Sequence, residues 1–169
     1  DVTASTVLDD EAQSVFAGNN TPADGVANEK VATGAAGSLF TAGSDGVTSV
    51  TISNGAFNVI YKNEAGFAQT EAVTWGAGVA TADGTTTFTA VSEHYAGGAA
   101  VLVIKADGSY SLTVNAPVAH PAAAGVEGPA EENTTISIGF TVTDGDGDTA
   151  SGTLNVNVND DAPVAKIVE

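Results

Sequence analysis

The sequence predicts an all-β protein, an antiparallel β-sandwich of the immunoglobulin-like, Greek-key type with long irregular connections. Gly, Ala, Thr, Ser and Val dominate the 169 residues, and no window of useful length carries apolar residues at helical spacing. Short segments instead alternate apolar and polar residues, which is typical of strands with one buried face. Turns that contain Gly, Asn or Asp separate these segments at the short intervals that a sandwich shows.

The expected strands follow in chain order. The first four occupy residues 47–53, 57–62, 71–75 and 85–92. A hairpin then forms around Asp107-Gly108, a dipeptide that favours a tight turn between strands at residues 100–105 and 109–116. Tyr110, Leu112 and Val114 alternate along its second strand and are expected to face inward.

The clearest pair of strands comes last. Large apolar residues fill the even positions of residues 134–143, from Ile136 to Val142, with small polar residues between them. Residues 153–159 repeat this pattern with Leu154, Val156 and Val158. We therefore expect these strands to bury their even-numbered side chains.

Two regions read as irregular connections, residues 18–36 and residues 116–133, the second of which contains three prolines. Such connections often lie on the binding side of a β domain, and more commonly only cross between sheets. Residues 1–161 are expected to form a single module. Residues 162–169 then form a linker or the start of a next module, because Pro163 favours an extended exit.

Composition excludes several classes of partner. The net charge of −17 and the pI near 4.1 argue against nucleic acid and anionic membrane surfaces, which would repel the chain. Cysteine is absent, so disulfides do not stabilise the fold. We expect no direct membrane insertion, since no apolar run of about 18 residues occurs.

The acidic residues concentrate in clusters, the densest of which is the turn Asp144-Gly145-Asp146-Gly147-Asp148. Carboxylates this close repel one another, and the four lysines of the chain form no cluster that could offset the repulsion. Calcium prefers such oxygen ligands, and the glycines allow the backbone to bend around an ion. The sequence therefore predicts a Ca²⁺ site at Asp144, Asp146 and Asp148, with a solvated acidic turn as the alternative.

Two further clusters are predicted to bind calcium. They are Asp9, Asp10 and Glu11 near the start, and Asn159, Asp160 and Asp161 after the last strand. Weaker candidates are Asp45, Asp83, Asp107, Glu131 and Glu132. Asp83 and Asp107 each precede a glycine, so a hairpin turn explains them without an ion.

Enzymatic activity is not expected. The sequence has no nucleophile elbow and no zinc-ligand spacing. His94 lies beside Glu93 and Tyr95, which could make a general-base pair, but a structural histidine is the simpler interpretation, and we interpret His120 as a loop residue. Sugar binding generally uses exposed aromatic platforms, for which Tyr61 and Tyr95 are candidates, whereas Trp75 lies within an alternating strand and is expected to pack in the core.

Several of these segments together resemble domains of giant RTX adhesins of Gram-negative bacteria. The segments are residues 72–76 (AVTWG), 106–110 (ADGSY), 116–120 (APVAH), 140–150 (FTVTDGDGDTA) and 158–163 (VNDDAP). The resemblance implies a calcium-stabilised β-sandwich in the distal, ligand-binding region of a type I secreted adhesin. Such an adhesin is extracellular, stays on the cell surface and mediates attachment and biofilm formation.

The resemblance also bears on partners and on the type of calcium site. Its implied partners are neighbouring modules of the same chain, which could share calcium at each junction. The alternative is a module that itself binds a carbohydrate or peptide of a host or surface. In some such adhesins a related domain is split by an inserted binding module, for which this chain has no room. The glycine-rich nonapeptides of RTX secretion regions are missing, and an EF-hand is excluded because Thr149 and Asn155 occupy the positions that need Gly and Glu.

Overall fold

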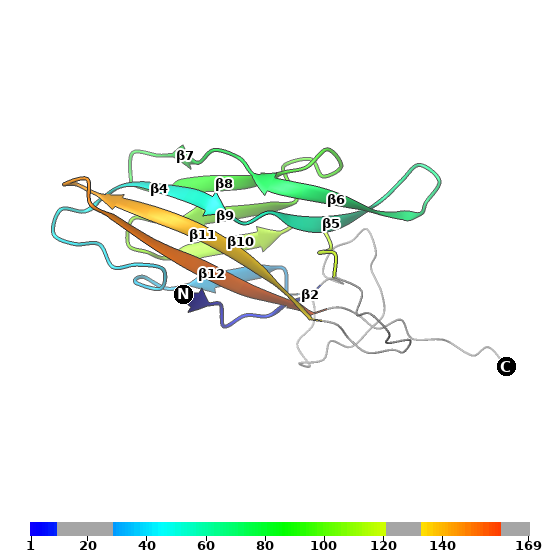
Figure 1. Ribbon diagram of the computed structural model, residues 1–169, viewed down its shortest axis with the longest axis horizontal. Coiled ribbons are helices and arrows are strands. Elements are labelled where there is room, and N and C mark those ends of the chain that lie inside the picture. The colour runs from blue at the N-terminus through cyan, green and yellow to red at the C-terminus, as the bar shows by residue number, and fades with distance from the viewer. Residues whose placement is uncertain (10–28, 121–132, 160–169) are drawn as a thin grey trace.

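The computed structural model describes residues 1–9, 29–120 and 133–159, and every structural statement below concerns these residues. Within them the chain forms twelve β-strands and no helix, so the all-β prediction is confirmed (Figure 1). The strands are β1 (Val2–Thr3), β2 (Leu8–Asp9), β3 (Val31–Gly34), β4 (Val47–Asn54), β5 (Phe57–Lys62), β6 (Ala68–Trp75), β7 (Val79–Ala80), β8 (Thr86–Val91), β9 (Ala100–Ile104), β10 (Tyr110–Val114), β11 (Thr134–Asp144) and β12 (Thr149–Asn159). A search of the described residues finds no helix long and apolar enough to cross a membrane.

The strands form two sheets that pack face to face. The five-stranded sheet has the order β1-β12-β11-β4, and β2 also pairs with β12. The seven-stranded sheet has the order β3-β10-β9-β8-β6-β5, with β7 paired to β8. All pairings are antiparallel except those of β1 and β2 with β12, which are parallel.

The strand order is that of an immunoglobulin-like sandwich with an addition. In the immunoglobulin fold, strands C, F and G form one sheet, and strands B, E and D are neighbours in the other. Here β4, β11 and β12 correspond to strands C, F and G, and β3, β10 and β9 correspond to strands B, E and D. Strands β5 to β8 lie in the chain between β4 and β9, the second and third strands of this core, and β8 adds them to the edge of the second sheet beside β9.

The core lies between the sheets and follows the predicted alternation. The even-numbered apolar residues from Ile136 to Val142 in β11 and from Leu154 to Val158 in β12 are buried, as are Tyr110, Leu112 and Val114 of β10. The largest fully buried side chains come from both sheets, among them Phe88, Leu102 and Leu154. The prediction of inward-facing positions is therefore confirmed for all three strands.

The prediction that residues 18–36 are irregular is wrong for β3. This strand pairs with β10, which brings Gly34 opposite Tyr110. A Cβ on Gly34 would lie only 2.1 Å from the Tyr110 ring, so the glycine makes room for that ring. Because the strand has four residues and two of them are alanine and glycine, it leaves no alternation that sequence reasoning could detect.

The long connection after β10 is also more ordered at its start than expected. Val118 forms an isolated bridge with Val59 of β5, and the Ile60 and Ala119 amides donate to Pro117 O and Asn58 O, both at 2.8 Å. Residues 117–119 therefore occupy the edge of β5 that β6 leaves open.

Candidate functional site

The aspartate turn closes the β11–β12 hairpin through its own hydrogen bonds. Asp144 Oδ1 accepts the backbone amides of Asp146 at 3.1 Å and Asp148 at 2.8 Å, and the Asp144 amide donates to Asp148 O at 3.0 Å. Gly147 has a φ of 92°, in the left-handed region that favours glycine. One carboxylate of the three predicted ligands thus already organises the turn, as an aspartate does in an ordinary tight turn.

The inward-facing register does not extend through all three aspartates. Asp144 ends β11 and is half-buried, whereas Asp146 and Asp148 lie in the turn and are exposed. The even-numbered alternation of Phe140 and Val142 ends at Asp144, because the chain leaves the strand there and enters the turn. A calcium ion at this turn would therefore be held at the surface.

Asp45, a weaker candidate, lies beside this turn. The Asp45 carbonyl oxygen lies 2.5 Å from where a Cβ on Gly145 would be, so only glycine fits at this approach. Thr48 Oγ1, in β4, donates to Asp144 O at 2.8 Å and joins the strand that follows Asp45 to the hairpin. No group of three or more His, Cys, Asp or Glu side chains arranged to hold a metal ion is found in the described part of the chain.

The other two predicted clusters begin at adjacent positions. Parallel pairing of β2 with β12 places Leu8 beside Val158 and Asp9 beside Asn159. Asp9 is fully buried and Asn159 is 5% exposed. The Glu29 amide donates to Asp9 Oδ2 at 3.0 Å, and the Asp9 amide donates to Glu29 O at 2.8 Å.

The Asp9–Asn159 pair fits the ligand chemistry of calcium. It offers a carboxylate and an amide oxygen, both hard ligands, at a position sheltered from water. The remaining members of the two clusters, Asp10, Glu11, Asp160 and Asp161, lie outside the described residues, as do Glu131 and Glu132. The pair and the aspartate turn lie at opposite ends of β12, whose 11 residues span about 33 Å at about 3.3 Å per residue. Any calcium sites at the two ends are therefore separate (Figure 1).

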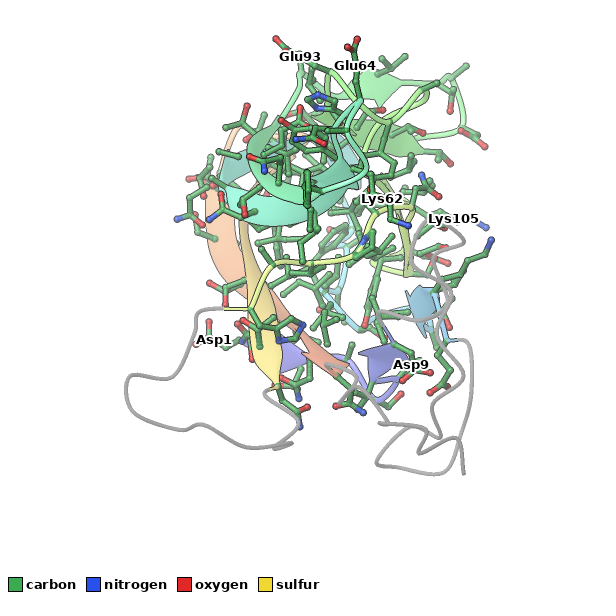
Figure 2. All side chains as sticks on the ribbon, turned by 90° about the vertical axis from the view of Figure 1, so that its right-hand side faces the viewer. Asp1, Asp9, Lys62, Glu64, Glu93 and Lys105 are labelled. Carbon is green, nitrogen blue, oxygen red and sulfur yellow. The ribbon has the colours of Figure 1, made fainter. Side chains whose placement is uncertain are left out.

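A third cluster of polar side chains lies where β6 meets the segment after β8. Glu71 Oε2 accepts the Ser92 hydroxyl at 2.8 Å and contacts His94 Nδ1 at 3.0 Å, and Glu71 Oε1 accepts the Glu93 amide at 2.7 Å. The His94 ring stacks on Tyr61 of β5, with ring centroids 3.5 Å apart. Figure 2 shows Glu93 and Glu64 on the upper side of the molecule and Asp9 on the lower side.

This third cluster fixes a loop and does not form a catalytic triad. Burial alone would raise the pKa of Glu71, but the Glu93 amide and the His94 and Ser92 side chains outweigh it and lower the pKa. The Ser92 hydroxyl donates to Glu71, whereas a nucleophilic serine gives its proton to the imidazole. Sequence reasoning assigned His94 the neighbours Glu93 and Tyr95 and missed Glu71, which lies 23 residues away.

The remaining aromatic residues are mostly engaged in packing. The Trp75 Nε1 donates to Gly55 O at 3.0 Å, and its ring lies 6.1 Å from that of Phe57. The prediction that Trp75 packs against the core is confirmed. The Tyr95 hydroxyl donates to Ile60 O, and burial, helped by the charge of Glu71, raises the pKa of this hydroxyl.

The two glycine-preceding aspartates organise turns, as expected. Asp83 Oδ1 accepts the Thr81 hydroxyl and the Thr85 amide, and Asp107 Oδ1 accepts the Ser109 hydroxyl at 2.6 Å. These hydrogen bonds lower the pKa of both carboxyls, with the threonine and serine side chains as the largest causes. Both aspartates are explained without a metal ion.

The fold and these sites define an acidic, immunoglobulin-like β-sandwich domain with oxygen-bearing side chains at both ends of its last strand. The chain belongs to the DUF5801 family, described as a domain of unknown function, whose model matches residues 5–157. The match runs from just before β2 almost to the end of β12. No curated protein and no solved structure matches the chain.

Proposed function

We propose that this chain is a calcium-stabilised structural module of a bacterial cell-surface adhesin of the RTX type, which extends the adhesin from the cell. The adjacent positions of Asp9 and Asn159 carry the proposal. The sequence predicts one calcium-binding cluster that begins at Asp9 and another that begins at Asn159. Although the two clusters are far apart in the sequence, their first residues are neighbours on the paired strands β2 and β12. A buried carboxylate at that position, in a chain of net charge −17, supports a cation there.

The electrostatic argument supports the same assignment. Two carboxylates 4 Å apart repel by about 1 kcal/mol in water and by about 4 kcal/mol at the effective dielectric near a protein surface. The chain has 21 acidic and only 4 basic side chains, so ion pairs can offset little of this repulsion. Calcium would supply positive charge, with Asp9 and Asn159 as ligands, and would couple folding to ion binding.

The position of the pair supports a role at a junction between modules. Asn159 is the last residue of β12, and the chain continues from it into Asp160 and Asp161. An ion held there would restrict the direction in which the chain leaves the sandwich, whereas a linker without such a restraint is flexible. Stiff junctions suit a protein that must project a binding region away from a cell.

Thermal unfolding tests the proposal. The 169-residue chain is unfolded in EDTA, in millimolar calcium and in millimolar magnesium, and circular dichroism follows the loss of strand structure. At a calcium concentration 100 times the Kd, binding adds about 2.7 kcal/mol to the free energy of unfolding. We expect a rise in Tm with calcium that magnesium does not reproduce. Equal Tm values in all three solutions would refute structural calcium binding.

A further inference from the structure

A cavity of about 370 Å³ lies at the start of β5 and β11, and neither the charge clusters nor the Glu71 network uses it. Phe57 and Asn58 line it from β5, Thr134 and Ile136 line it from β11, and residues 118–120 close a third side. Since Thr134 pairs with Val158, the cavity is at the same end of the sandwich as the Asp9–Asn159 pair.

The walls of this cavity are fixed before any ligand binds. The bridge between Val59 and Val118 and the two backbone hydrogen bonds beside it attach residues 117–119 to β5. The Phe57 ring packs against Trp75, whose indole is held in turn by Gly55 O. Preformed cavities of this kind are typical of small-molecule sites, because the protein does not have to order itself on binding.

Among the described residues, none that lines the cavity is a carboxylate or a lysine, although 21 of the 169 residues are acidic. Phe57, Val118 and Ile136 provide apolar surface, and Asn58 and Thr134 provide groups that both donate and accept hydrogen bonds. His120 is the one titratable side chain among the described residues of the lining. A cationic ligand would find no counter-charge on the described walls, and an anionic ligand would approach against the net charge of −17.

A peptide strand fits this place less well than a small molecule. Strand addition needs an open sheet edge with unpaired amides and carbonyls. On one side of the cavity the edge of β5 already pairs with Pro117 and Ala119. On the other side β11 pairs with β4 only from Gly139 onward, and only Thr134, Thr135 and Ile136 of its free edge line the cavity, which is short for an added strand. The cavity is near the lower limit of about 300 to 1,000 Å³ for ligand pockets, which suits one small ring more than an extended chain.

We propose that this cavity binds one unit of a neutral saccharide, with the apolar walls against the C–H face of the sugar and Asn58 and Thr134 hydrogen-bonded to its hydroxyls. Sugars combine these two kinds of surface without net charge. The proposal is independent of calcium binding at Asp9 and Asn159, because neither residue lines the cavity.

The test is an NMR titration of the whole chain with D-glucose, D-galactose, D-mannose and N-acetyl-D-glucosamine. Each sugar is added separately up to about 100 mM, a concentration that detects the weak binding of a single sugar ring. We expect at least one sugar to cause saturable shifts of the Asn58, Thr134 and Ile136 amides. The amides of Glu93 and Asp146, which lie away from the cavity, should not move. Parallel titrations in EDTA and in calcium separate this result from calcium binding.

A matched pair of variants and an anion probe complete the test. Asn58→Ala should weaken the binding about tenfold, the value of roughly one hydrogen bond. Asn155→Ala, which removes an asparagine that bonds Ser137 in the five-stranded sheet, should leave the binding unchanged. Absence of saturable shifts with all four sugars in the wild-type chain overturns the proposal. Shifts of the same amides with sodium acetate but with no sugar also overturn it, in favour of a carboxylate site.

Discussion

The substitution Asp9→Asn separates a calcium ligand from a merely buried acid. Asn is close to Asp in size and keeps an oxygen that can accept the Glu29 amide, which Asp9 Oδ2 accepts at 3.0 Å. The substitution removes the negative charge and replaces one carboxylate oxygen with an NH₂ group, in a side chain that is fully buried. The effect of the charge can therefore be measured without opening a cavity.

The expected magnitude in EDTA is small. A hydrogen bond to a charged group contributes about 1.5 to 3 kcal/mol, and a neutral one contributes about 0.5 to 1.5 kcal/mol, so the weaker acceptor costs about 1 kcal/mol. Removing a buried charge from a chain of net charge −17 acts in the opposite direction, because it relieves desolvation and repulsion. The two effects should leave the free energy of unfolding within about 1 kcal/mol of the wild-type value.

The expected magnitude in calcium is large. Wild-type protein at 100 times the Kd gains about 2.7 kcal/mol, which corresponds to about 5 to 10 °C in Tm for a chain of this size. The Asp9→Asn variant should lose most of that gain, because an amide oxygen is a poorer calcium ligand than a carboxylate. The assay is differential scanning calorimetry of both proteins in EDTA and in calcium.

The matched control is Asp146→Asn, which removes the same charge from an exposed position in the aspartate turn. If Asp146→Asn abolishes the calcium response and Asp9→Asn keeps it, the turn holds the ion and the reasoning from the buried pair is wrong. The assignment of Asp9 as a calcium ligand would also be refuted if Asp9→Asn were much less stable than wild type in EDTA but gained as much stability from calcium.

Three further predictions follow from the described contacts. Folding lowers the pKa of Glu71, so its carboxylate stabilises the fold at pH values above the ordinary pKa of 4.5, and this contribution is lost as the pH falls through the lower pKa of the folded state. The free energy of unfolding, measured with urea, should therefore fall more steeply with decreasing pH for wild type than for Glu71→Gln. Gly108→Ala places a Cβ 2.0 Å from Phe40 O at a φ of 79° and should lower the free energy of unfolding by more than about 3 kcal/mol. Gly147→Ala, at a φ of 92° with no atom within 4 Å of the new Cβ, should lower it by about 1 to 2 kcal/mol. Equal losses of Tm in the two variants would contradict the role of the close approach to Phe40. Leu154→Ala should cost about 2 to 5 kcal/mol in chemical denaturation, and a loss below about 1 kcal/mol would contradict its place in the core.

Local patterns predicted most of the fold. The alternation from Ile136 to Val142 and from Leu154 to Val158 identified the longest hairpin and its buried face, because a sheet with one buried face imposes a period of two on the sequence itself. Asp107-Gly108 identified the β9–β10 turn for a similarly local reason, since Gly108 has a φ of 79° there. Strands of two residues, such as β1, β2 and β7, are too short to show any period.

Contacts between distant segments could not be predicted. Asp9 and Asn159 were both marked as candidate ligands, but parallel pairing of β2 with β12 is set by the packing of the whole sandwich and leaves no sign in either segment. Glu71 went unnoticed for the same reason, since its partners Ser92 and His94 follow a different strand. The cavity beside Asn58 exists only where three separate segments meet.

The parallel pairing of β1 and β2 with β12 has a mechanical consequence. When a tensile force pulls the two ends of the chain apart, it draws β2 and β12 in opposite directions along their common axis. The hydrogen bonds between the strands, from Val2 and Leu154 to Asp9 and Asn159, are then loaded together in shear, and they do not open one after another like a zip. A sandwich joined in this way resists stretching most strongly along the axis that β1, β2 and β12 share, because separation along that axis requires all of these hydrogen bonds to break at once.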